Sequence, residues 1–300
     1  MFKGISIYDF RLKFKTNEDC LQYLYDIKWN EGYYCRKCDC TKSYSGRTKW
    51  YRKCSECSYD ESVQSGTLFH GMKLPLLKAF EILFMLSTRK KGMSILEIGK
   101  TYDINKNSAE LLKSKAQLAM KSSGNHKLLR NVHVDEFAVG GKEKGKQGRS
   151  STSKKTKIVL ACEIVEHKGK MTLGNAYAQV IENYSTEQLR PIFNYKINTE
   201  ASVLTDKWKS YLPINDTHDI NQVISEGGKN FKELNILVML FKGWLRGIHH
   251  HVSKKRMQCY IDEFMFRFNR KAFPESSFKS LISRFMKSKP YKIALREGHG

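Results

Sequence analysis

The sequence predicts an α/β fold in which a small cysteine-rich module and a helical region precede a domain built on a mixed sheet. Two C-x-x-C pairs lie between residues 35 and 57, a strongly apolar helical pattern covers 74–90, and short strand candidates begin near residue 131. A chain of 300 residues can hold two or three such modules. We divide it into an N-terminal helical segment (1–30), the cysteine-rich module (31–70), a helical region (71–125), the sheet domain (126–275) and a basic C-terminal tail (276–300).

The N-terminal helices are predicted from apolar spacing and capping residues. Residues 15–30 and 74–90 carry apolar residues at helical spacing, and Thr16 can cap the first of these helices. Two shorter helices are expected to begin at Ser94 and Asn107, because each has a glutamate three residues further on. Two short helices joined by a four-residue connector are typical of a helix-turn-helix.

The sheet domain is predicted from a change of periodicity near residue 131. Alternating valines at 132 and 134 give way to longer apolar runs, a helix is expected from about Ser185, and two long helices close the region. Strands followed by a helix, another strand and later helices indicate a mixed α/β sheet. The further strands are expected at 158–165, 173–181 and 202–205, and the long helices at about 232–248 and 253–270.

The cysteine pairs have the spacing of a structural zinc site. Fifteen residues separate Cys38 from Cys54, within the range between the two knuckles of a tetrahedral four-thiolate site. Such a site is closed, so we expect Zn²⁺ bound by Cys35, Cys38, Cys54 and Cys57 to stabilise the module and not to catalyse. Cys40 could compete as a ligand, but we interpret it as a bystander.

The charge of the chain indicates a polyanionic partner. Lys and Arg total 53 against 30 Asp and Glu, a formal net charge of +23. Side chains that neutralise phosphates release counterions, so an excess of this size favours nucleic acid over a merely soluble basic protein. Residues 49–53, Lys-Trp-Tyr-Arg-Lys, interleave basic and aromatic side chains as nucleic-acid contacts do, the alternative being a solvated hairpin packed by one tryptophan.

Membrane and secreted classes are not favoured. No apolar run reaches the roughly 18 residues of a spanning helix, and the first residues lack a charged-then-apolar signal pattern. We therefore expect a cytoplasmic protein that associates with nucleic acid and has no membrane partner.

Two aspartates follow short strands and form a candidate catalytic site. Asp135 ends the run Val132-His133-Val134-Asp135, and Asp206 follows Val203-Leu204-Thr205. Carboxylates on neighbouring strands can hold Mg²⁺ or Mn²⁺ for phosphoryl transfer. The helix at 232–248 offers Asn235 as a third ligand, and Lys242, seven residues later, lies on the same side of that helix. Glu226 and Glu233 are alternative third ligands.

Other polar residues have simpler interpretations. His133 is interpreted as packing or supporting the site, with a direct metal role as the alternative, and the run 249–251 of three histidines as a DNA contact or helix cap, with a metal site as the alternative. A further set of basic residues is expected to form a DNA-backbone surface, against the alternative of a solvated helix face. These residues are Lys254, Lys255, Arg256, Arg267, Arg270 and Lys271.

The motifs of the sheet domain, in their order, resemble those of a known family. With the cysteine pattern they are similar to the zinc-ribbon group of insertion-sequence transposases, ISXO-type branch, in the DDE superfamily. The resemblance covers roughly residues 15–275. The motifs are Val134-Asp135-Glu136-Phe137, Gly140-Gly141, Thr205-Asp206-x-Trp208-x-Ser210-Tyr211, Phe241-Lys242-Gly243-Trp244-Leu245-Arg246-Gly247, and residues 260–270, YIDEFMFRFNR.

The resemblance implies a fold, an activity and roles for four residues. It implies an RNase H-like catalytic domain at 126–275, preceded by a zinc ribbon and a helix-turn-helix, and metal-dependent cleavage and transfer of DNA strands. Asp135 and Asp206 would be the first two metal ligands, Asn235 the third, and Lys242 would grip a phosphate near the scissile bond. Most DDE enzymes have Glu at the third position. Asn offers an oxygen but no charge, so metal affinity would depend more on the aspartates.

Three functions remain open on the sequence. The first is a transposase that binds terminal inverted repeats and target double-stranded DNA, at least as a homodimer when two ends are synapsed. The second, kept open by Asn235, is a catalytically inactive zinc-ribbon and helix-turn-helix DNA-binding protein derived from a transposase. The third is an RNase H-like nuclease of branched or hybrid substrates, against which the N-terminal modules argue.

Overall fold

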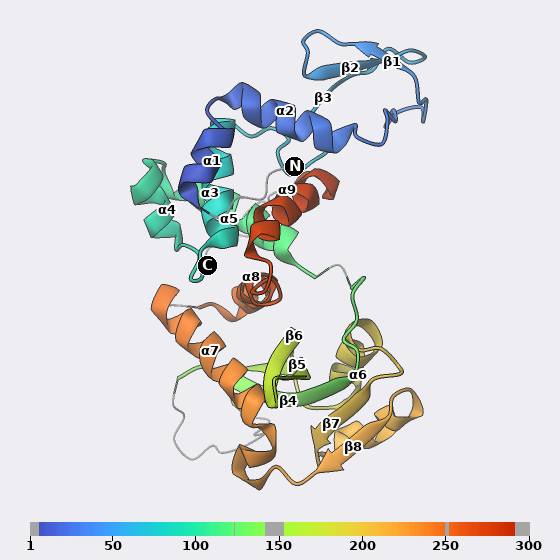
Figure 1. Ribbon diagram of the computed structural model, residues 1–300, viewed down its shortest axis with the longest axis vertical. Helices are drawn as coiled ribbons and strands as arrows, with labels where there is room; N and C mark the ends of the chain where they lie inside the picture. Colours follow the sequence, from blue (N-terminus) through green and yellow to red (C-terminus); the bar gives the residue numbers. More distant parts are fainter. Residues whose placement is uncertain (1–5, 123, 142–152, 250–251, 292–300) are drawn as a thin grey trace. The chain divides into compact units, whose positions relative to one another are not determined.

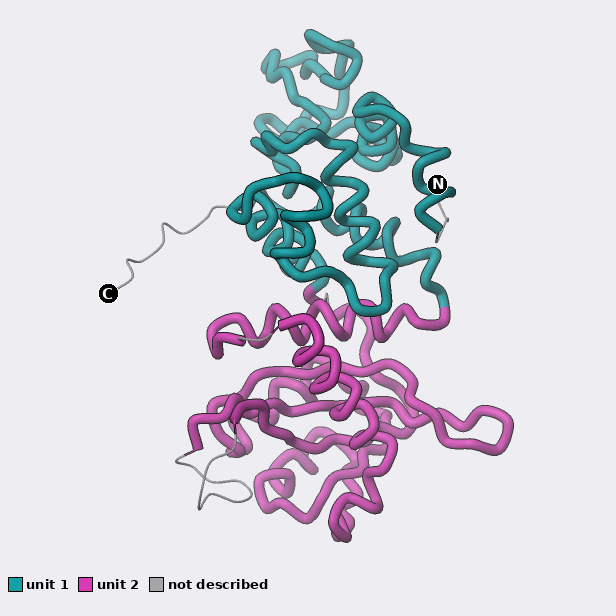
Figure 2. Tube along the Cα trace, turned by 90° about the vertical axis from the view of Figure 1, so that its left-hand side faces the viewer, with its two compact units in different colours: residues 1–120, 273–300 teal, residues 121–272 magenta. Residues whose placement is uncertain are grey.

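The computed structural model of the chain describes residues 6–122, 124–141, 153–249 and 252–291 (Figure 1). The chain forms two compact units, drawn in different colours in Figure 2: residues 1–120 with 273–300 are unit 1, and residues 121–272 are unit 2. Among the described residues, no helix is both long enough and apolar enough to cross a bilayer.

Unit 1 combines helices with a small antiparallel sheet in the order β1-β2-β3. Its elements are α1 (Ile7–Lys13), α2 (Asn17–Lys28), β1 (Ser43–Ser45), β2 (Tyr51–Cys54), β3 (Asp60–Ser62), α3 (Leu76–Thr88), α4 (Ile95–Tyr102), α5 (Lys106–Met120), the 3-10 turn η4 (Pro274–Ser276) and α9 (Ser277–Lys287).

Capping side chains set where the helices of unit 1 begin. Thr16 and Asp19 form a complete capping box on α2, and Ser94 forms one with Glu97 on α4, as the spacing predicts. The start of α5 differs from the expectation. The N–H of Ser108 donates to Oδ1 of Asn105, so Asn105 caps the helix, two residues before the expected cap Asn107, and the helix begins at Lys106.

Phenylalanines from distant parts of the chain form the core of unit 1. The ring of Phe278 in α9 lies 5.7 Å from that of Phe10 in α1 and 5.8 Å from that of Phe80 in α3. In α9, Phe278, Leu281, Ile282 and Phe285 are all fully buried. The segment expected to belong to a basic tail therefore contains a packed helix, because its apolar residues repeat at helical spacing.

Unit 2 is built on a five-stranded mixed sheet with the order β6-β5-β4-β7-β8. The first three strands pair antiparallel, whereas β4 with β7 and β7 with β8 pair parallel. This sheet and its helices confirm the expected α/β class. The elements are β4 (Asn131–Val139), β5 (Thr156–His167), β6 (Lys170–Ile181), α6 (Thr186–Lys196), β7 (Ser202–Asp206), η1 (Lys209–Asp216), β8 (Ile220–Val223), η2 (Glu226–Phe231), α7 (Lys232–Ile248), η3 (Lys254–Arg256) and α8 (Met257–Phe268).

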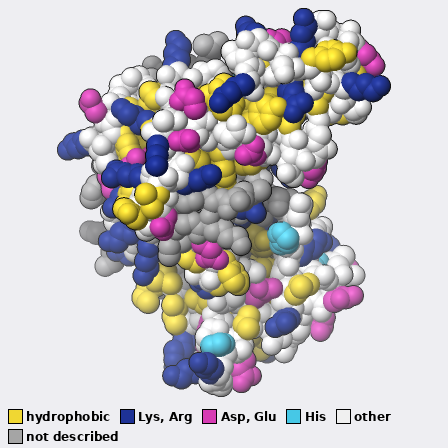
Figure 3. Space-filling model, turned by 45° about the horizontal axis from the view of Figure 1, so that its top comes forward, with side chains coloured by type: hydrophobic (Ala, Val, Ile, Leu, Met, Phe, Trp, Pro, Cys, Tyr) yellow, Lys and Arg dark blue, Asp and Glu magenta, His cyan; other side chains and the backbone are white. Residues whose placement is uncertain are grey.

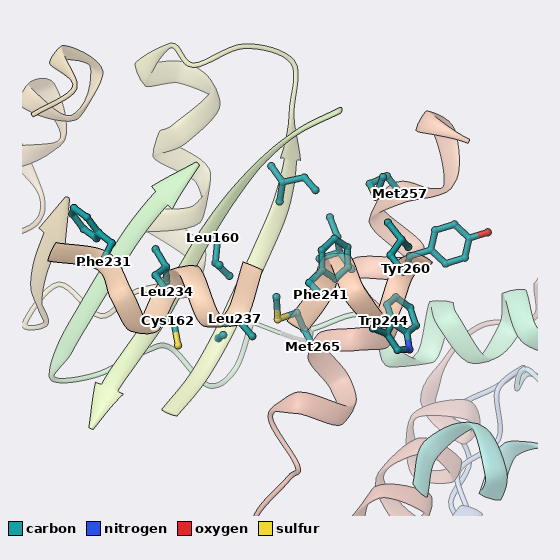
Figure 4. Packing of buried hydrophobic residues seen from close by; sticks show 14 of the residues in the cluster. Leu160, Cys162, Phe231, Leu234, Leu237, Phe241, Trp244, Met257, Tyr260 and Met265 are labelled. Carbon is teal, nitrogen blue, oxygen red and sulfur yellow. The ribbon is translucent and has the colours of Figure 1, made fainter. Parts of the chain in front are cut away.

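Alternation along the strands gives the sheet two apolar faces. Val132 and Val134 of β4 pack with α6 and η1 on one face. On the other face, Leu160 and Cys162 of β5 pack against α7 and α8. Figure 4 shows the stripe of α7 that begins at Leu234 turned toward these strand residues. Residues of β4 at odd numbers, which include Asp135, therefore belong to the face covered by α7.

Side chains from both ends of the α8 segment form hydrogen bonds with the backbone at the outer edge of β6. Asn269 donates to the carbonyl of Ala176 and accepts from its N–H, both at 2.8 Å. Gln258 accepts from the N–H of Val180 at 2.9 Å, and the ammonium of Lys271 donates to the carbonyl of Leu173 at 2.6 Å. These bonds take the place of a sixth strand and leave fewer free backbone groups for pairing with another chain.

Candidate functional sites

Four cysteines of the ribbon converge on one point. Their sulfur atoms all lie within 4.8 Å of one another, with Cys35–Cys57 at 3.6 Å and Cys38–Cys54 at 3.5 Å. Sulfurs at the corners of a tetrahedron with Zn–S bonds of about 2.3 Å lie about 3.8 Å apart, so these residues fit Zn²⁺. The sulfur of Cys40 instead contacts the hydroxyl of Ser55 at 3.4 Å, as expected for a bystander.

A buried ion pair fastens the ribbon to α2. The ammonium of Lys28 donates to Glu61 at 2.8 Å and also to the backbone carbonyls of Ser62 and Ser65. The Glu61 side chain is fully buried and that of Lys28 is 13% exposed. The guanidinium of Arg52 lies 5.3 Å from the ring of Tyr25 in α2. Part of the basic and aromatic run of the ribbon therefore packs within unit 1.

Asp135 and Asp206 occupy equivalent positions on neighbouring parallel strands. The register pairs β4 with β7 from Asn131 with Ser202 to Val134 with Thr205, and each aspartate is the next residue of its strand. Parallel strands lie about 4.8 Å apart, and residues in register point to the same face. The two carboxylates therefore lie side by side on the face covered by α7.

Hydrogen bonds hold each aspartate and its neighbours. Oδ1 of Asp135 accepts from the N–H of Glu136 at 2.8 Å, and Oδ1 of Asp206 accepts from the N–H of Trp208 at 3.2 Å. The buried hydroxyl of Tyr211 donates to Glu136 at 2.5 Å. Burial, and then the charges of Glu136, Asp135 and Asp206, raise the pKa of Tyr211 well above its ordinary value. The charges of all three carboxylates therefore act on the tyrosine hydroxyl.

Two family models match the chain. A transposase zinc-ribbon domain matches residues 15–60, and an ISXO2-like transposase domain matches residues 127–269. The chain belongs to the zinc-ribbon transposases of the IS1595 type. No curated protein matches it. The transposase therefore has the expected fold class, an RNase H-like sheet domain preceded by a zinc ribbon.

Asn235 of the transposase lies on α7 and is exposed. Its amide nitrogen donates to the carbonyl of Gly228 in the turn before the helix, at 3.0 Å. An open pocket of about 420 Å³ is lined by Asn235 and Gly228, together with Lys229 and Lys232. The amide is accessible from solvent.

Lys242 lies on the same face of the sheet as the aspartates. Its ammonium is 5.5 Å from the ring centroid of Phe137, which follows Asp135 by two residues on β4. Burial, and then the charges of Arg246 and Lys155, lower the pKa of this lysine. Partial burial and neighbouring cations both disfavour the charged form of this lysine, and a bound anion would stabilise that form. This environment is compatible with the expected phosphate contact.

The alternative ligands have different surroundings. Burial lowers the pKa of His133, and the charge of Glu233 on α7 opposes this shift. His133 also packs edge-on against Phe231, with the ring centroids 5.9 Å apart.

Glu226 is exposed in the turn before α7. Of the histidine run, His249 packs on Tyr260 at 4.2 Å, whereas residues 250 and 251 lie outside the described residues.

Part of the expected DNA-backbone surface is structural. The guanidinium of Arg267 pairs with Glu263 at 2.9 Å, and the two side chains are 8% and 1% exposed. Arg270 lies on the ring of Phe266 at 3.8 Å, and Lys271 is bound to the edge of β6. Glu263 and Phe266 lie one helical turn before Arg267 and Arg270, whereas Lys271 is held by another strand. Because Arg267 is buried in its ion pair, the solvated or DNA-facing interpretation does not apply to it.

Two functional features of the transposase have weak sequence signals. The turn Glu226-Gly227-Gly228 that holds Asn235 has positive φ at all three residues, and the glycine pair was its one visible signal. The bond between Tyr211 and Glu136 joins two of the quoted motifs. Each motif is visible alone, but only the fold shows that they touch.

Proposed function

We propose that this chain is an active DNA transposase, which binds the ends of an insertion sequence and catalyses Mg²⁺-dependent strand cleavage and strand transfer. The observation that carries the proposal is the common register of Asp135 and Asp206 on parallel strands. Two carboxylates at equivalent positions on one face form a donor set suited to a hard divalent cation.

The proposed site divides its tasks among residues of three elements. Asp135 and Asp206 would hold Mg²⁺ or Mn²⁺, which when bound supplies charge stabilisation for in-line displacement at phosphorus. Asn235 would add a neutral oxygen ligand, and Lys242 would hold a DNA phosphate beside the carboxylates. Tyr211 would fix Glu136 and, through it, the backbone next to Asp135.

Unit 1 would bind the terminal inverted repeats. The hairpin of the zinc ribbon presents Arg47 over Tyr51 and Lys49 over Trp50, each cation 4.3 Å from its ring centroid. On the face drawn in Figure 3, Lys and Arg side chains are spread among carboxylates and do not form a single patch. Several separate contacts along the DNA backbone are therefore more consistent with this surface than one deep basic groove.

The helix pair α4 and α5 would offer only one end of its second helix to DNA. Lys106 and Asn107 in the first turn of α5 are exposed, whereas Lys113 and Lys115 are buried. The ammonium groups of these lysines donate to the carbonyls of Met93 and Leu68. Recognition helices contact base edges through their N-terminal residues, so this exposure is compatible with the proposed role.

A second candidate function is a transposase-derived DNA-binding protein without catalysis. The specific observation in its favour is that the third ligand position is Asn235, which brings no charge, and its amide nitrogen is bound to Gly228.

For the active form we propose at least a homodimer, because two DNA ends must be brought together and joined.

Cleavage of a labelled linear DNA that carries the ends of the element tests the proposal. With Mg²⁺ or Mn²⁺ we expect nicks at the ends, and we expect Asp135→Ala and Asp206→Ala to abolish them while end binding is retained. Asp219→Ala is the matched control, because Asp219 is an exposed carboxylate just before β8, at the opposite end of that strand from the register partner of Asp206. Tight end binding without any nicking by the native protein would support the second candidate instead.

A further inference from the structure

The turn that precedes α7 is held in an unusual backbone conformation. Glu226, Gly227 and Gly228 have φ values of 48°, 67° and 90° in succession. The N–H of Gly228 donates to both the carbonyl and the hydroxyl of Ser225, at 2.9 and 3.1 Å. The side chain of Asn230 donates to the carbonyl of Ile224 at 2.7 Å. The turn is thus fixed on both sides, and the direction of the Gly228 carbonyl is fixed with it.

This turn begins close to the strand end that carries Asp206. Asp206 is the register partner of Val223, the last residue of β8, and Gly228 follows Val223 by five residues. The only side chain of α7 that the carbonyl of Gly228 is seen to bind, among the described residues, is Asn235. The turn therefore connects the end of the catalytic sheet to the proposed third ligand.

A backbone carbonyl determines which atom of an asparagine faces it. A carbonyl accepts hydrogen bonds only, so the group at 3.0 Å from Gly228 is the NH₂ of Asn235. The amide oxygen, which is the one atom of Asn that binds a hard cation, is then directed away from the carbonyl. A carboxylate at position 235 would place a second acceptor against this carbonyl, which gives a physical reason for an amide at this position.

Gly228 also leaves the space that Asn235 occupies. A Cβ built on Gly228 would lie 2.6 Å from the amide nitrogen of Asn235, closer than real Cβ contacts allow. A Cβ built on the neighbouring Gly227 would meet nothing within 4 Å. Both glycines have positive φ, so an alanine at either position carries comparable backbone strain, but only at 228 does it displace the asparagine.

We propose that Gly228 is a positioning residue for catalysis, whose carbonyl turns the Asn235 amide so that its oxygen is presented to the divalent cation. The inference rests on the proposed function, because it assumes a cation held by Asp135 and Asp206. It goes further in assigning a role to a residue that touches neither DNA nor metal, and in explaining the choice of amide at the third position.

The test compares Gly228→Ala with its matched control Gly227→Ala in the full chain. Binding of Mn²⁺ alone is measured by calorimetry, and the rise of the unfolding temperature with added Mn²⁺ is measured in parallel. We expect Gly228→Ala to weaken Mn²⁺ binding by about tenfold, as for other residues that orient a ligand, and Gly227→Ala to leave it within about twofold. In an Asn235→Ala background, Gly228→Ala should have no further effect.

Other outcomes identify which idea has failed. Equal effects of the two alanines, or an undiminished effect of Gly228→Ala when Asn235 is already Ala, would overturn the positioning role. If the native protein binds no Mn²⁺ in a manner that depends on Asp135, the proposed function itself fails. Should Gly228→Ala not fold, Ser225→Ala removes one of the two bonds to the Gly228 N–H, and a smaller weakening of Mn²⁺ binding is then required.

Discussion

Asp135 and Asp206 each stand one residue beyond the last register pair of β4 and β7, Val134 with Thr205. This relationship connects the sequence motifs to a site, because it places two carboxylates 71 positions apart on one face of one sheet. The helix that covers this face brings Lys242 over Phe137. The remaining features of the fold determine how stable and how accessible this arrangement is.

The zinc site should be required for the ribbon to fold. We expect one Zn²⁺ per chain, and we expect Cys54→Ser to release it and unfold the ribbon, because four thiolates replace a core that this segment lacks. Cys40→Ser should retain the metal, since Cys40 contacts Ser55 instead. Metal content after dialysis, with circular dichroism, provides the measurement. Loss of zinc from the Cys40 variant alone would show that the ligand set is wrong.

The ion pair between Lys28 and Glu61 should contribute strongly to the stability of unit 1. In Glu61→Gln a buried ammonium loses its counter-charge, which costs about 3–5 kcal/mol. The control is Arg11→Ala, which breaks the exposed pair with Glu81 in the same unit and should cost less than about 1 kcal/mol. Urea unfolding followed by tryptophan fluorescence measures both changes. Equal losses in the two variants would contradict the importance of burial.

The edge of β6 should depend on Asn269. Asn269→Ala removes two hydrogen bonds to the backbone of Ala176, so we expect a loss of about 1–3 kcal/mol. Hydrogen exchange at the Ala176 amide should accelerate, together with an increased tendency of the protein to self-associate. Asn221→Ala, at an exposed position of β8, is the control. Unchanged exchange at Ala176 would mean that the side chain does not protect this edge.

Asp262 should give the stability of unit 2 a particular pH dependence. Burial raises the pKa of its carboxyl from 3.8 to about 6, although Gln258 and the charges of Lys121 and Lys196 oppose this shift. The folded state therefore holds the proton more tightly than the unfolded state, and the stabilising contribution present below about pH 4 is lost as the pH rises through 6. The stability of Asp262→Asn relative to the native protein should thus increase from pH 4 to pH 7. A pH-independent difference in urea midpoints would contradict this.

The aspartates could be predicted from the sequence because the relevant signals are local. Alternating apolar residues before Asp135 and Asp206 predict strands, and strand ends of a parallel pair meet at one edge. The four cysteines are equally local, since their spacing alone defines the knuckles. Thr16 and Ser94 likewise cap the helices that their spacing predicts.

Features that depend on distant partners could not be predicted in this way. Arg267 has the pattern of an exposed basic residue. Glu263 is one turn away in the same helix, but only the fold brings the ring of Trp244 to the arginine and buries the ion pair. The orientation of Asn235 depends on a turn after β8, a short strand with no clear apolar alternation. The helix α9 was hidden by its basic composition, although Phe278 and Phe285 show its apolar face.

The most direct test of the central claim is the affinity of the protein for Mn²⁺ in native, Asp135→Ala, Asp206→Ala and doubly substituted forms. If both carboxylates hold the same ion, each single substitution should weaken binding by at least about tenfold, and the double substitution should cost less than the two single effects combined. Asp219→Ala should bind as the native protein does. Native affinity in either single variant, or fully additive losses, would show that the two aspartates do not share a cation.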